Sequence, residues 1–365
     1  MRQRKRSISY LCLQKTSEGQ ASHAHVHEII QGLRANGWDV TLFEPSGNRG
    51  RLWEFLKAQV RLWKRSRDID ALYVRWHILA LPTLLWARIR DVPIVQEVNG
   101  PYEDLFIAYP WTRRLAILLL SVGKWSLRLS SAIVTVTPEL KRWLEEQVDG
   151  ILVYNIPNGA NAQLFRPDVT ADVALTRPYA LFFGALAAWQ GLEVLLAAVG
   201  DTGWPSDVIL VIAGEGAERA RVEKAAATSS RIHYLGKVPY RRMPGIVAGS
   251  LVGISPQTDL GGRAATGLSP IKVFETLACG VPVIVSDFPG QAELVREWNC
   301  GVVFPSGDAS ALARAVATLN SCPAIRAQMG QRGRQAIERE HSWAKRARDT
   351  SAVLESVVGS ARSSR

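Results

Sequence analysis

The chain has 365 residues, 47% of them hydrophobic and 21% charged, and its formal net charge at pH 7 is +11. This length and composition predict a soluble globular protein of two domains. The basic balance indicates anionic partners, namely a nucleotide, a nucleic acid or an acidic membrane surface, although a basic protein without such a partner stays open. Nucleic acid is disfavoured, because the sequence has no aromatic RNA-binding motif, zinc-ligand spacing or helix-turn-helix pattern.

Neither the cysteines nor the apolar runs predict secretion or membrane insertion. The four cysteines lack metal-ligand spacing and are expected to be ordinary thiols in a reducing compartment. The longest apolar run near the middle, residues 115–122, is shorter than the roughly twenty residues of a membrane span. The basic start MRQRKR is followed only by ISYLCL, which is too short for a signal peptide and is typical of a first strand. We therefore expect a cytoplasmic protein.

Strand-like and helix-like segments alternate along residues 1–170. The strand-like segments are ISYLCL, DVTLFEP, ALYVRW, PIVQEV and SAIVTVT. This alternation predicts a parallel, doubly wound sheet, whose ligands gather at the carboxyl ends of the strands. The loop around Gly19 and the turn around Glu97 and Asn99 are therefore expected at the edge of a cleft. The first loop has no GxGxxG, so we expect no dinucleotide site there.

Three histidines, His23, His25 and His27, follow the first loop. Alternate residues of a helix do not face one another, and no acidic or cysteine residue lies at ligand spacing, so we expect no metal site. One of these histidines is expected to point into the cleft, and we place His23 there.

Two segments of the first half mix basic and aromatic residues. Residues 49–67 hold Trp53 and Trp63 among arginines and lysines, and residues 109–129 repeat the mixture around LAILLLSV. Basic amphipathic helices with aromatic residues are typical of proteins that lie on an anionic bilayer. The alternative is a core-facing helix with a solvated basic face. Two such segments in the same half favour the membrane.

The alternation resumes in residues 171–341. The most informative stretch there, residues 268–287, reads LSPIKVFETLACGVPVIVSD. Ser269 is predicted to be a helix N-cap, Pro270 the first helical residue, and Gly280 the left-handed end before a buried strand. A Gly-rich loop before a helix start offers N–H groups and a positive dipole end to an anion. An ordinary strand-loop-helix unit is the alternative.

The motifs of the second half resemble those of one enzyme family. The run GLSPIKVFETLACGVPVIVSDFPGQAELV, which starts at Gly267, is similar to the donor-site signature of the retaining GT-B glycosyltransferases of the family 4 type, the glycosyl transferases group 1. Further matches are YNIPNGANAQLF, FFGALAAWQGLEVLLAA, VIAGEG and IHYLG. The resemblance implies an α/β fold of two doubly wound Rossmann-like domains facing across a cleft. Residues 1–170 would serve the acceptor and 171–341 the nucleotide-sugar donor, and a helix in 342–365 would cross back to the first domain.

The resemblance also implies roles on the donor side. Glu275 matches the second glutamate of the family motif, which usually binds the ribose. Gly267 stands where a first glutamate usually contacts the donor sugar, so this contact is in doubt. The backbone amides of Gly267, Leu268 and Ser269 would hold the sugar and the β-phosphate instead.

The usual phosphate-binding charges are missing from the loop that opens the second domain. Ala185 and Gln190 stand where the family often places an Arg and a Lys. The nearest cations that compensate are Lys272 and Arg263. Cleaving a glycosyl–phosphate bond builds negative charge on the leaving diphosphate, and a nearby cation stabilises that charge. Two glycines complete the predicted donor side: Gly184 and Gly214.

Retention of configuration, which the resemblance implies, needs a carboxylate behind the sugar or an attack from the front face. The donor motif supplies no such carboxylate, and the clustered acids near the cleft edge are Glu97, Glu103 and Asp104. A front-face mechanism, in which the departing phosphate helps to deprotonate the acceptor, is therefore favoured. The predicted catalytic residues are Glu275, Lys272 and Asn99, and the predicted acceptor-side residues are Gly19, His23, Glu97 and Asn99.

These inferences predict a hexosyltransferase that moves a sugar from a nucleotide diphosphate-sugar to a lipid-linked or polysaccharide acceptor in cell-surface polysaccharide biosynthesis. We expect it to need no metal or other cofactor and to lie peripherally on the inner face of the cell membrane. The alternatives are a catalytically weak partner of the same fold that binds nucleotide or lipid, and a sugar-nucleotide epimerase. None of the motifs names the sugar, the base or the linkage.

Overall fold

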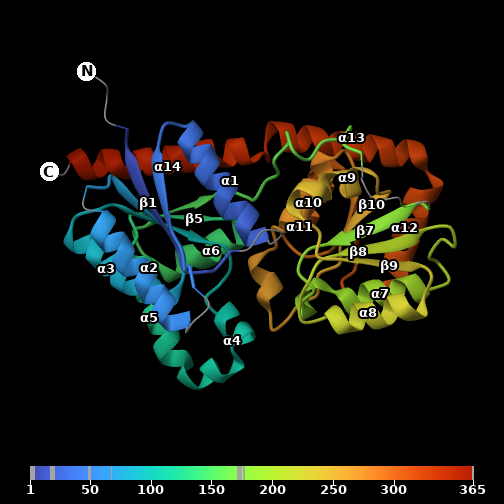
Figure 1. The fold of residues 1–365 in the computed structure, drawn as a ribbon, viewed down its shortest axis with the longest axis horizontal. Coiled ribbons are helices and arrows are strands. Elements are labelled where there is room, and N and C mark those ends of the chain that lie inside the picture. The colour runs from blue at the N-terminus through green and yellow to red at the C-terminus, as the bar shows by residue number, and fades with distance from the viewer. Residues whose placement is uncertain are drawn as a thin grey trace. The chain divides into compact units, whose positions relative to one another are not determined.

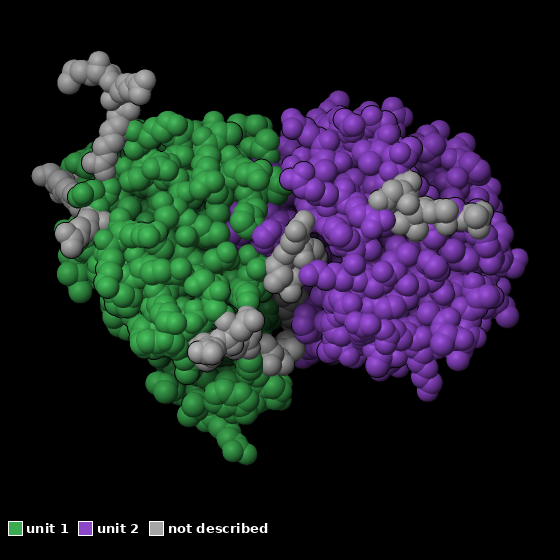
Figure 2. Space-filling model, in the orientation of Figure 1, with its two compact units in different colours: residues 1–16, 27–157, 344–365 green, residues 17–26, 158–343 purple. Residues whose placement is uncertain are grey.

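The computed structural model describes residues 5–16, 21–47, 51–66, 68–170, 175 and 177–363. By packing, the chain divides into two units, which are drawn in Figures 1 and 2. Unit 1 consists of residues 1–16, 27–157 and 344–365, and unit 2 of residues 17–26 and 158–343. Each unit is built around one parallel six-stranded sheet. The predicted α/β class with two doubly wound domains is therefore confirmed.

The sheet of unit 1 has the strand order β2-β1-β3-β4-β5-β6, and all neighbouring strands are parallel. Its strands are β1 (Ser7–Cys12), β2 (Asp39–Phe43), β3 (Ala71–Arg75), β4 (Ile94–Val98), β5 (Ala132–Thr135) and β6 (Leu152–Asn155). Its helices are α1 (Ala21–Ala35), α2 (Arg51–Arg65), α3 (Leu81–Ile89), α4 (Asp104–Ala108), α5 (Ala116–Arg128) and α6 (Pro138–Gln147), with short 3₁₀ turns at Ile78–Ala80 and Pro110–Leu115. The residues of α1 up to Val26 group with unit 2.

The central strands of unit 1 form where the sequence is mostly apolar, and their residues are almost all buried. Leu11, Leu72, Val74 and Ile94 are fully buried in one cluster. Strands covered by helices on both faces need apolar side chains on both, which explains why these segments do not alternate polar and apolar residues.

The sheet of unit 2 has the order β12-β11-β10-β7-β8-β9 and is also parallel throughout. Its strands are β7 (Tyr179–Phe183), β8 (Ile209–Ala213), β9 (Ile232–Gly236), β10 (Val252–Ser255), β11 (Val283–Ser286) and β12 (Gly301–Phe304). Its helices are α7 (Leu192–Gly200), α8 (Arg219–Thr228), α9 (Met243–Ala248), α10 (Ile271–Ala278), α11 (Gln291–Trp298), α12 (Ala309–Ser321) and α13 (Pro323–Arg339). Successive residues of β7 point to opposite faces, so that Leu181 lies in one core cluster and Phe182 in another.

The chain returns to unit 1 through its last helix, α14 (Trp343–Ser363). The side chain of Arg346 donates to the backbone carbonyl of Pro157 at 3.0 Å. The indole Nε1 of Trp38 donates to the hydroxyl of Ser351 at 2.8 Å. The predicted final helix that returns to the first domain is therefore confirmed.

The two units separate between Pro157 and Asn158, whereas the sequence placed the boundary at residue 170. The segment that follows Pro157 belongs to unit 2 because its backbone is bonded there. The amide of Ala160 donates to the carbonyl of His341 at 3.0 Å.

Candidate donor site and family

The strand order of unit 2 reverses between β7 and β10, and open α/β sheets bind ligands at such a point, beyond the carboxyl ends of the strands. The loops that leave these two strands approach each other closely there. A Cβ added at Gly191, whose φ is +69°, would lie 1.7 Å from the carbonyl oxygen of Pro256. Only glycine therefore lets the loop after β7 run against the loop after β10. This edge holds the predicted donor residues.

Lys272, Gln190 and Gly184 meet at this edge although they are far apart in the chain. The Nζ of Lys272 donates to the side-chain carbonyl oxygen of Gln190 at 2.6 Å. The same Nζ lies 3.8 Å from the centre of the Phe182 ring, and a Cβ added at Gly184 would come within 3.5 Å of it. The loop after β7 and the first turn of α10 thus hold one ammonium group between an amide, a ring face and a glycine.

Burial lowers the pKa of Lys272 to about 7, and the charge of Glu275 opposes that shift. The hydrogen-bond partner of this ammonium group is a neutral amide rather than a carboxylate, so its positive charge is not cancelled by direct pairing. An anion that approaches this ammonium group stabilises its protonated form, because a nearby opposite charge favours the charged state. The arrangement is suited to binding a phosphate group.

Glu275 lies one turn further along α10 and is 4% exposed. Its carboxylate accepts a hydrogen bond from the hydroxyl of Tyr240 at 2.8 Å. Tyr240 begins the short 3₁₀ turn Tyr240–Arg242 that precedes α9. Sequence reasoning missed this tyrosine, because 35 residues separate it from Glu275 and no local pattern links them.

The start of α10 differs from the prediction. Pro270 occupies the N-cap position, the helix begins at Ile271, and no side chain caps it. The hydroxyl of Ser269 instead accepts a hydrogen bond from the backbone N–H of Asn158 at 3.3 Å. The prediction of Ser269 as the N-cap was wrong because this contact with a distant segment takes the hydroxyl away from the helix.

Two of the three amides predicted to hold the donor are used within the protein. The N–H of Gly267 donates to Ala264 at 2.9 Å, and that of Leu268 donates to Pro289 at 2.8 Å. Helix geometry leaves the N–H groups of the first turn, here those of Ile271 and Lys272, without intrahelical acceptors. These first-turn amides therefore suit an anion better than the amides of Gly267 and Leu268.

Gly214 lets the loop after β8 lie against the loop after β7. Its φ is +151°, and an added Cβ would lie 1.8 Å from the carbonyl oxygen of Gly184. The carbonyl of Gly214 accepts from the hydroxyl of Tyr234 at 2.8 Å. Gly184 and Gly214 thus shape the crevice through their backbones. The side chain of Arg263 and all of Gly19, both of which the sequence placed at the site, lie outside the described residues.

A second hydrogen-bonded group supports the loop that enters α10. The Nδ1 of His25 and the Oδ1 of Asn158 lie 3.1 Å apart, and the Asn158 amide Nδ2 donates to the carbonyl of Ser269 at 2.6 Å. His25 is 2% exposed and lies edge-on to the ring of Trp343. His23, the histidine that the sequence placed in the cleft, is only half-buried. The turn signal at Asn158 was visible in the sequence, but its partners were not.

In unit 1, Glu97 lies in a buried network at the carboxyl end of β4. Its fully buried carboxylate accepts hydrogen bonds from the Tyr73 hydroxyl at 2.7 Å, from Arg75 at 3.1 Å and from the Asn99 Nδ2 at 2.6 Å. The guanidinium group of Arg346 lies 3.7 Å away. Glu97 therefore holds the strand end and orients the half-buried Asn99, and its geometry gives no support to direct contact with an acceptor.

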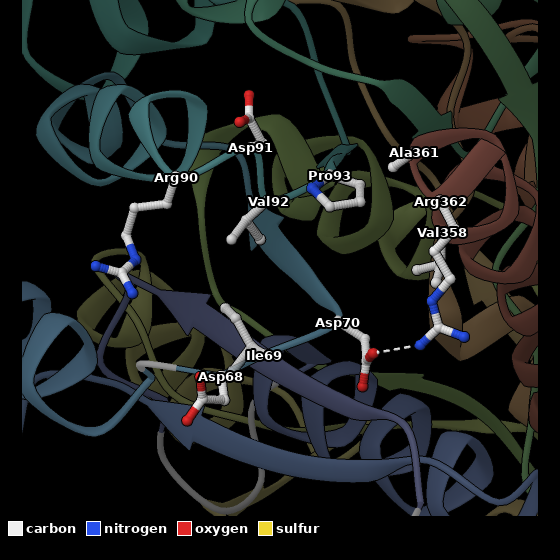
Figure 3. Close-up of a pocket in the computed structure, with 10 residues that line it drawn as sticks. All are labelled: Asp68, Ile69, Asp70, Arg90, Asp91, Val92, Pro93, Val358, Ala361 and Arg362. Carbon is white, nitrogen blue, oxygen red and sulfur yellow. Dashed lines mark hydrogen bonds and ion pairs between the residues drawn. The ribbon is translucent and has the colours of Figure 1, made fainter. Parts of the chain in front are cut away.

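A cavity of about 240 Å³ lies at the opposite edge of the same sheet (Figure 3). Its walls come from the segments that enter β3 and β4 and from the end of α14: Asp68, Ile69, Asp70, Arg90, Asp91, Val92, Pro93, Val358, Ala361 and Arg362. The carboxylate of Asp70 binds Arg362 at 2.8 Å and accepts from the backbone of Ser7 at 2.8 Å. These contacts anchor α14, and the amino-terminal edge is not where such sheets bind ligands.

Within the described ranges, no group of three or more His, Cys, Asp and Glu residues is placed to hold a metal ion. Among the described residues, this edge of the sheet offers an anion the ammonium of Lys272 and, on the same turn of α10, the first-turn amides.

Comparison with known proteins assigns both halves of the chain. The family model Glycosyl transferases group 1 matches residues 170–336, and Glycosyltransferase Family 4 matches residues 22–164. The chain is 26% identical to the phosphatidyl-myo-inositol mannosyltransferase of Mycobacterium leprae, over 92% of this chain and 93% of that protein.

One further relative and one solved structure extend the comparison. Over 52% of each chain, the identity is 29% to the GDP-mannose-dependent monoacylated alpha-(1-6)-phosphatidylinositol monomannoside mannosyltransferase of Corynebacterium glutamicum. The structure of sucrose-phosphate synthase from Thermosynechococcus elongatus matches with a TM-score of 0.80 at 18% identity, over 97% of this chain and 100% of that one. This last likeness shows the fold alone. The chain belongs to the GT-B glycosyltransferases of the family 4 type.

Proposed function

We propose that this glycosyltransferase is a retaining hexosyltransferase that moves a sugar from a nucleoside diphosphate-sugar to a lipid-linked acceptor. GDP-mannose is the first donor to test, because the Corynebacterium relative is named as dependent on it. A phosphatidylinositol-type lipid is the first acceptor to test, because the names of both relatives contain one. The enzyme would work peripherally on the inner face of the cell membrane, in the synthesis of cell-surface polysaccharide.

The observation that carries this proposal is the position of Lys272. Its ammonium group is fixed by Gln190 at 2.6 Å and lies on the first turn of α10, whose amides of Ile271 and Lys272 lack intrahelical acceptors. A diphosphate bound there would meet a positive charge and the positive end of a helix together. Lys272 thus takes over the role of the Arg and Lys that Ala185 and Gln190 replace.

The reaction would break the bond between the anomeric carbon and the diphosphate oxygen. A bond from the acceptor hydroxyl oxygen to the anomeric carbon would form on the same face, and the hydroxyl proton would pass to the leaving diphosphate. Lys272 would stabilise the charge that grows on this diphosphate, a contribution of about 3 to 4 kcal/mol for one well-placed donor in other enzymes. Glu275 would bind the ribose, and Asn99 would contact the sugar or the acceptor.

Donor binding is tested by the rise in melting temperature with a panel of nucleotide-sugars, since a ligand that binds only the folded state raises its stability. We expect GDP-mannose to raise it, and Glu275→Ala to remove most of that rise. Tyr240→Phe is the matched control, because it removes one hydrogen bond of the Glu275 carboxylate and keeps the carboxylate itself. If Glu275→Ala binds GDP-mannose like the wild type, the donor-site assignment is wrong.

Transfer is tested separately with labelled donor and a lipid extract. We expect label to enter the lipid fraction and GDP to accumulate in equal amount. Donor binding without transfer would identify a catalytically weak partner, and conversion of the free sugar nucleotide would identify an epimerase. Either result would contradict the proposed activity while leaving the donor site intact.

A further inference from the structure

No helix in the described ranges is long and apolar enough to cross a bilayer. Unit 1 exposes several large apolar side chains, and six of them lie within residues 104–128, which comprise α4, the turn Pro110–Leu115 and α5. We call this segment the α4–α5 arm; it extends away from the sheet at the bottom of Figure 1 and forms part of the green surface in Figure 2. Its exposed apolar residues and their exposed fractions are Tyr109 38%, Trp111 67%, Leu115 49%, Ile117 85%, Leu118 60% and Trp125 47%.

The polarity of α5 departs from that of an ordinary surface helix. Its exposed face carries Ile117 and, two turns later, Trp125. Its buried residues are Gly123, Ser126 and Leu127, and the hydroxyl of Ser126 accepts from the indole N–H of Trp76 at 3.2 Å. A surface helix normally turns apolar residues to the core and polar ones to water. The outward apolar face of α5 therefore needs an apolar partner.

Basic residues outnumber acidic ones along the arm, whose one acidic residue is Asp104 at its start; Arg128 at its end lies 3.8 Å from the carboxylate of Asp149. The sequence has no Asp or Glu between Asp104 and Glu139, whereas the arm carries four basic residues: Arg113, Arg114, Lys124 and Arg128. Arg113 and Arg114 are exposed and lie between Trp111 and Leu115 in the sequence. This combination is complementary to a partner that has an apolar interior and a negatively charged outer layer.

The other basic aromatic segment, α2, offers a weaker surface of the same kind. It exposes Leu52 at 71% and Trp53 at 59%. Its Lys57, however, is paired with Glu54 at 3.0 Å and lies 5.7 Å from the centre of the Trp53 ring. An acidic partner within the helix makes α2 less suited to an anionic apolar boundary than the arm.

We propose that the α4–α5 arm is the surface through which unit 1 binds a lipid bilayer with anionic headgroups. Ile117, Leu118 and Trp111 enter the boundary between headgroups and acyl chains, and Arg113 and Arg114 contact the phosphates. A bilayer satisfies both parts of this surface at once, because tryptophan rings settle at its interface and each basic residue near it adds about 1 kcal/mol. A protein partner would need its own acidic groove of matching shape.

This inference rests on the proposed function in one respect: a lipid acceptor explains why the protein would be at a membrane. The binding surface itself is argued from the arm alone. The test is co-sedimentation of the full chain with vesicles of phosphatidylcholine, with and without phosphatidylglycerol. We expect binding to the anionic vesicles and little to the neutral ones. Absence of binding to the anionic vesicles at low salt would overturn the proposal.

The decisive variant is Ile117→Ser, and the chain offers a close control. Ile117 is 85% exposed on the arm, whereas Ile89 is 84% exposed at the end of α3, outside it. We expect Ile117→Ser to lower the vesicle partition constant about tenfold, from the apolar area it withdraws from the acyl region. Ile89→Ser should change it less than twofold. Equal effects of the two substitutions would overturn the assignment to the arm.

The charge component is tested with the double substitution Arg113→Gln and Arg114→Gln. We expect it to weaken binding to anionic vesicles and to reduce the dependence of that binding on salt. Unchanged binding of this variant would contradict the role of the two arginines. Sedimentation without lipid gives the remaining outcome: a dimer that Ile117→Ser dissociates would show that the arm binds a second copy of this chain and overturn the bilayer proposal.

Failure of this proposal is distinguishable from failure of the donor site. GDP-mannose binding is measured without lipid, and Ile117→Ser lies outside the donor crevice. We expect this variant to keep its donor-induced rise in melting temperature. Vesicle binding without donor binding would leave the arm assignment standing and contradict only the proposed transferase chemistry.

Discussion

The Nζ of Lys272 donates a 2.6 Å hydrogen bond to the side chain of Gln190, the residue that stands where the family often has a lysine. The amide cannot supply positive charge itself, but it holds the ammonium group of a lysine from another element. Under the proposed function, the positive charge at the diphosphate comes from the first turn of α10 rather than from the loop after β7. The proposed donor chemistry therefore depends strongly on Lys272.

Replacing Lys272 by methionine should lower kcat/KM for sugar transfer by about two orders of magnitude, because the leaving diphosphate loses its cation. Lys224, an exposed lysine of α8, gives the matched control Lys224→Met, which should leave kcat/KM unchanged. Steady-state kinetics with labelled GDP-mannose checks both variants. Full activity of Lys272→Met would exclude its proposed role.

The lowered pKa of Lys272 makes stability depend on pH in a definite direction. In the unfolded chain a lysine titrates near 10.4, whereas burial lowers the folded pKa to about 7. Between these two pKa values the unfolded state binds more protons than the folded state. The contribution of Lys272 to the free energy of unfolding therefore increases as pH rises from about 7 to 10. Urea unfolding of the wild type and of Lys272→Met across this range should show the rise only in the wild type.

Donor affinity should follow the opposite trend, because the diphosphate prefers the protonated ammonium. We expect GDP-mannose binding to weaken as pH rises above 7, and binding to be accompanied by proton uptake near that pH. Titration calorimetry in two buffers of different ionisation enthalpy measures the uptake. Lys272→Met should show neither effect; if it keeps both, another group is responsible.

Asn158→Ala should reduce donor affinity more than its effect on folding explains. The substitution leaves the carbonyl of Ser269 and the ring of His25 without this partner, a loss of about 1 to 3 kcal/mol in stability. It also frees the loop that positions the first turn of α10. Asn161→Ala is the control, because Asn161 accepts from the nearby amides of Gln163 and Leu164. The Asn161 variant should bind donor like the wild type.

Glu97→Ala should destabilise unit 1 strongly, by about 3 to 5 kcal/mol, because it leaves Arg75 and Arg346 without the carboxylate they share. The exposed pair of Lys141 and Glu145, 3.6 Å apart, gives the comparison. Glu145→Ala should cost less than about 1 kcal/mol. Chemical denaturation of the two variants measures the difference, and equal losses would contradict the buried network.

Gly214→Ala should disturb the donor crevice through the backbone. Its Cβ would meet the Gly184 carbonyl at 1.8 Å, so we expect a loss of roughly 3 kcal/mol. Gly37 also has a positive φ, +90°, but nothing lies within 4 Å of an added Cβ. Gly37→Ala should therefore cost only about 1 kcal/mol, from backbone strain alone. Thermal unfolding separates the two.

The fold could be predicted because each strand can be recognised from the residues of its own short segment. Runs such as YALFF and ILVIA are apolar at every position, and this marks strands covered on both faces. The start of α10 could not be predicted in the same way. The residues around Ser269 are typical of a helix N-terminus with Ser269 as its cap. Its hydroxyl instead accepts a hydrogen bond from the backbone N–H of Asn158, which is 111 residues away.

The candidate site was predicted in part for the same reason. Lys272, Gln190 and Gly184 were named from resemblance, and the structure brings them together. Tyr240 was missed and His23 was chosen over His25, since the contacts of Tyr240 and His25 with Glu275 and Asn158 are made only by folding. Glu97 was expected at the edge of a cleft. It is buried instead, and its charge is paired with that of Arg346 on the last helix.

The environment of Lys272 has a chemical consequence beyond catalysis. Burial lowers the pKa of Lys272 to about 7, so a far larger share of its amine is uncharged at neutral pH than for an ordinary lysine, and an uncharged amine is a nucleophile. Ordinary surface lysines are almost fully protonated under the same conditions and react slowly with acylating reagents. An acylating reagent should therefore label Lys272 in preference to surface lysines. A ligand bound beside Lys272 would block this labelling, so the extent of labelling would report whether the site is occupied.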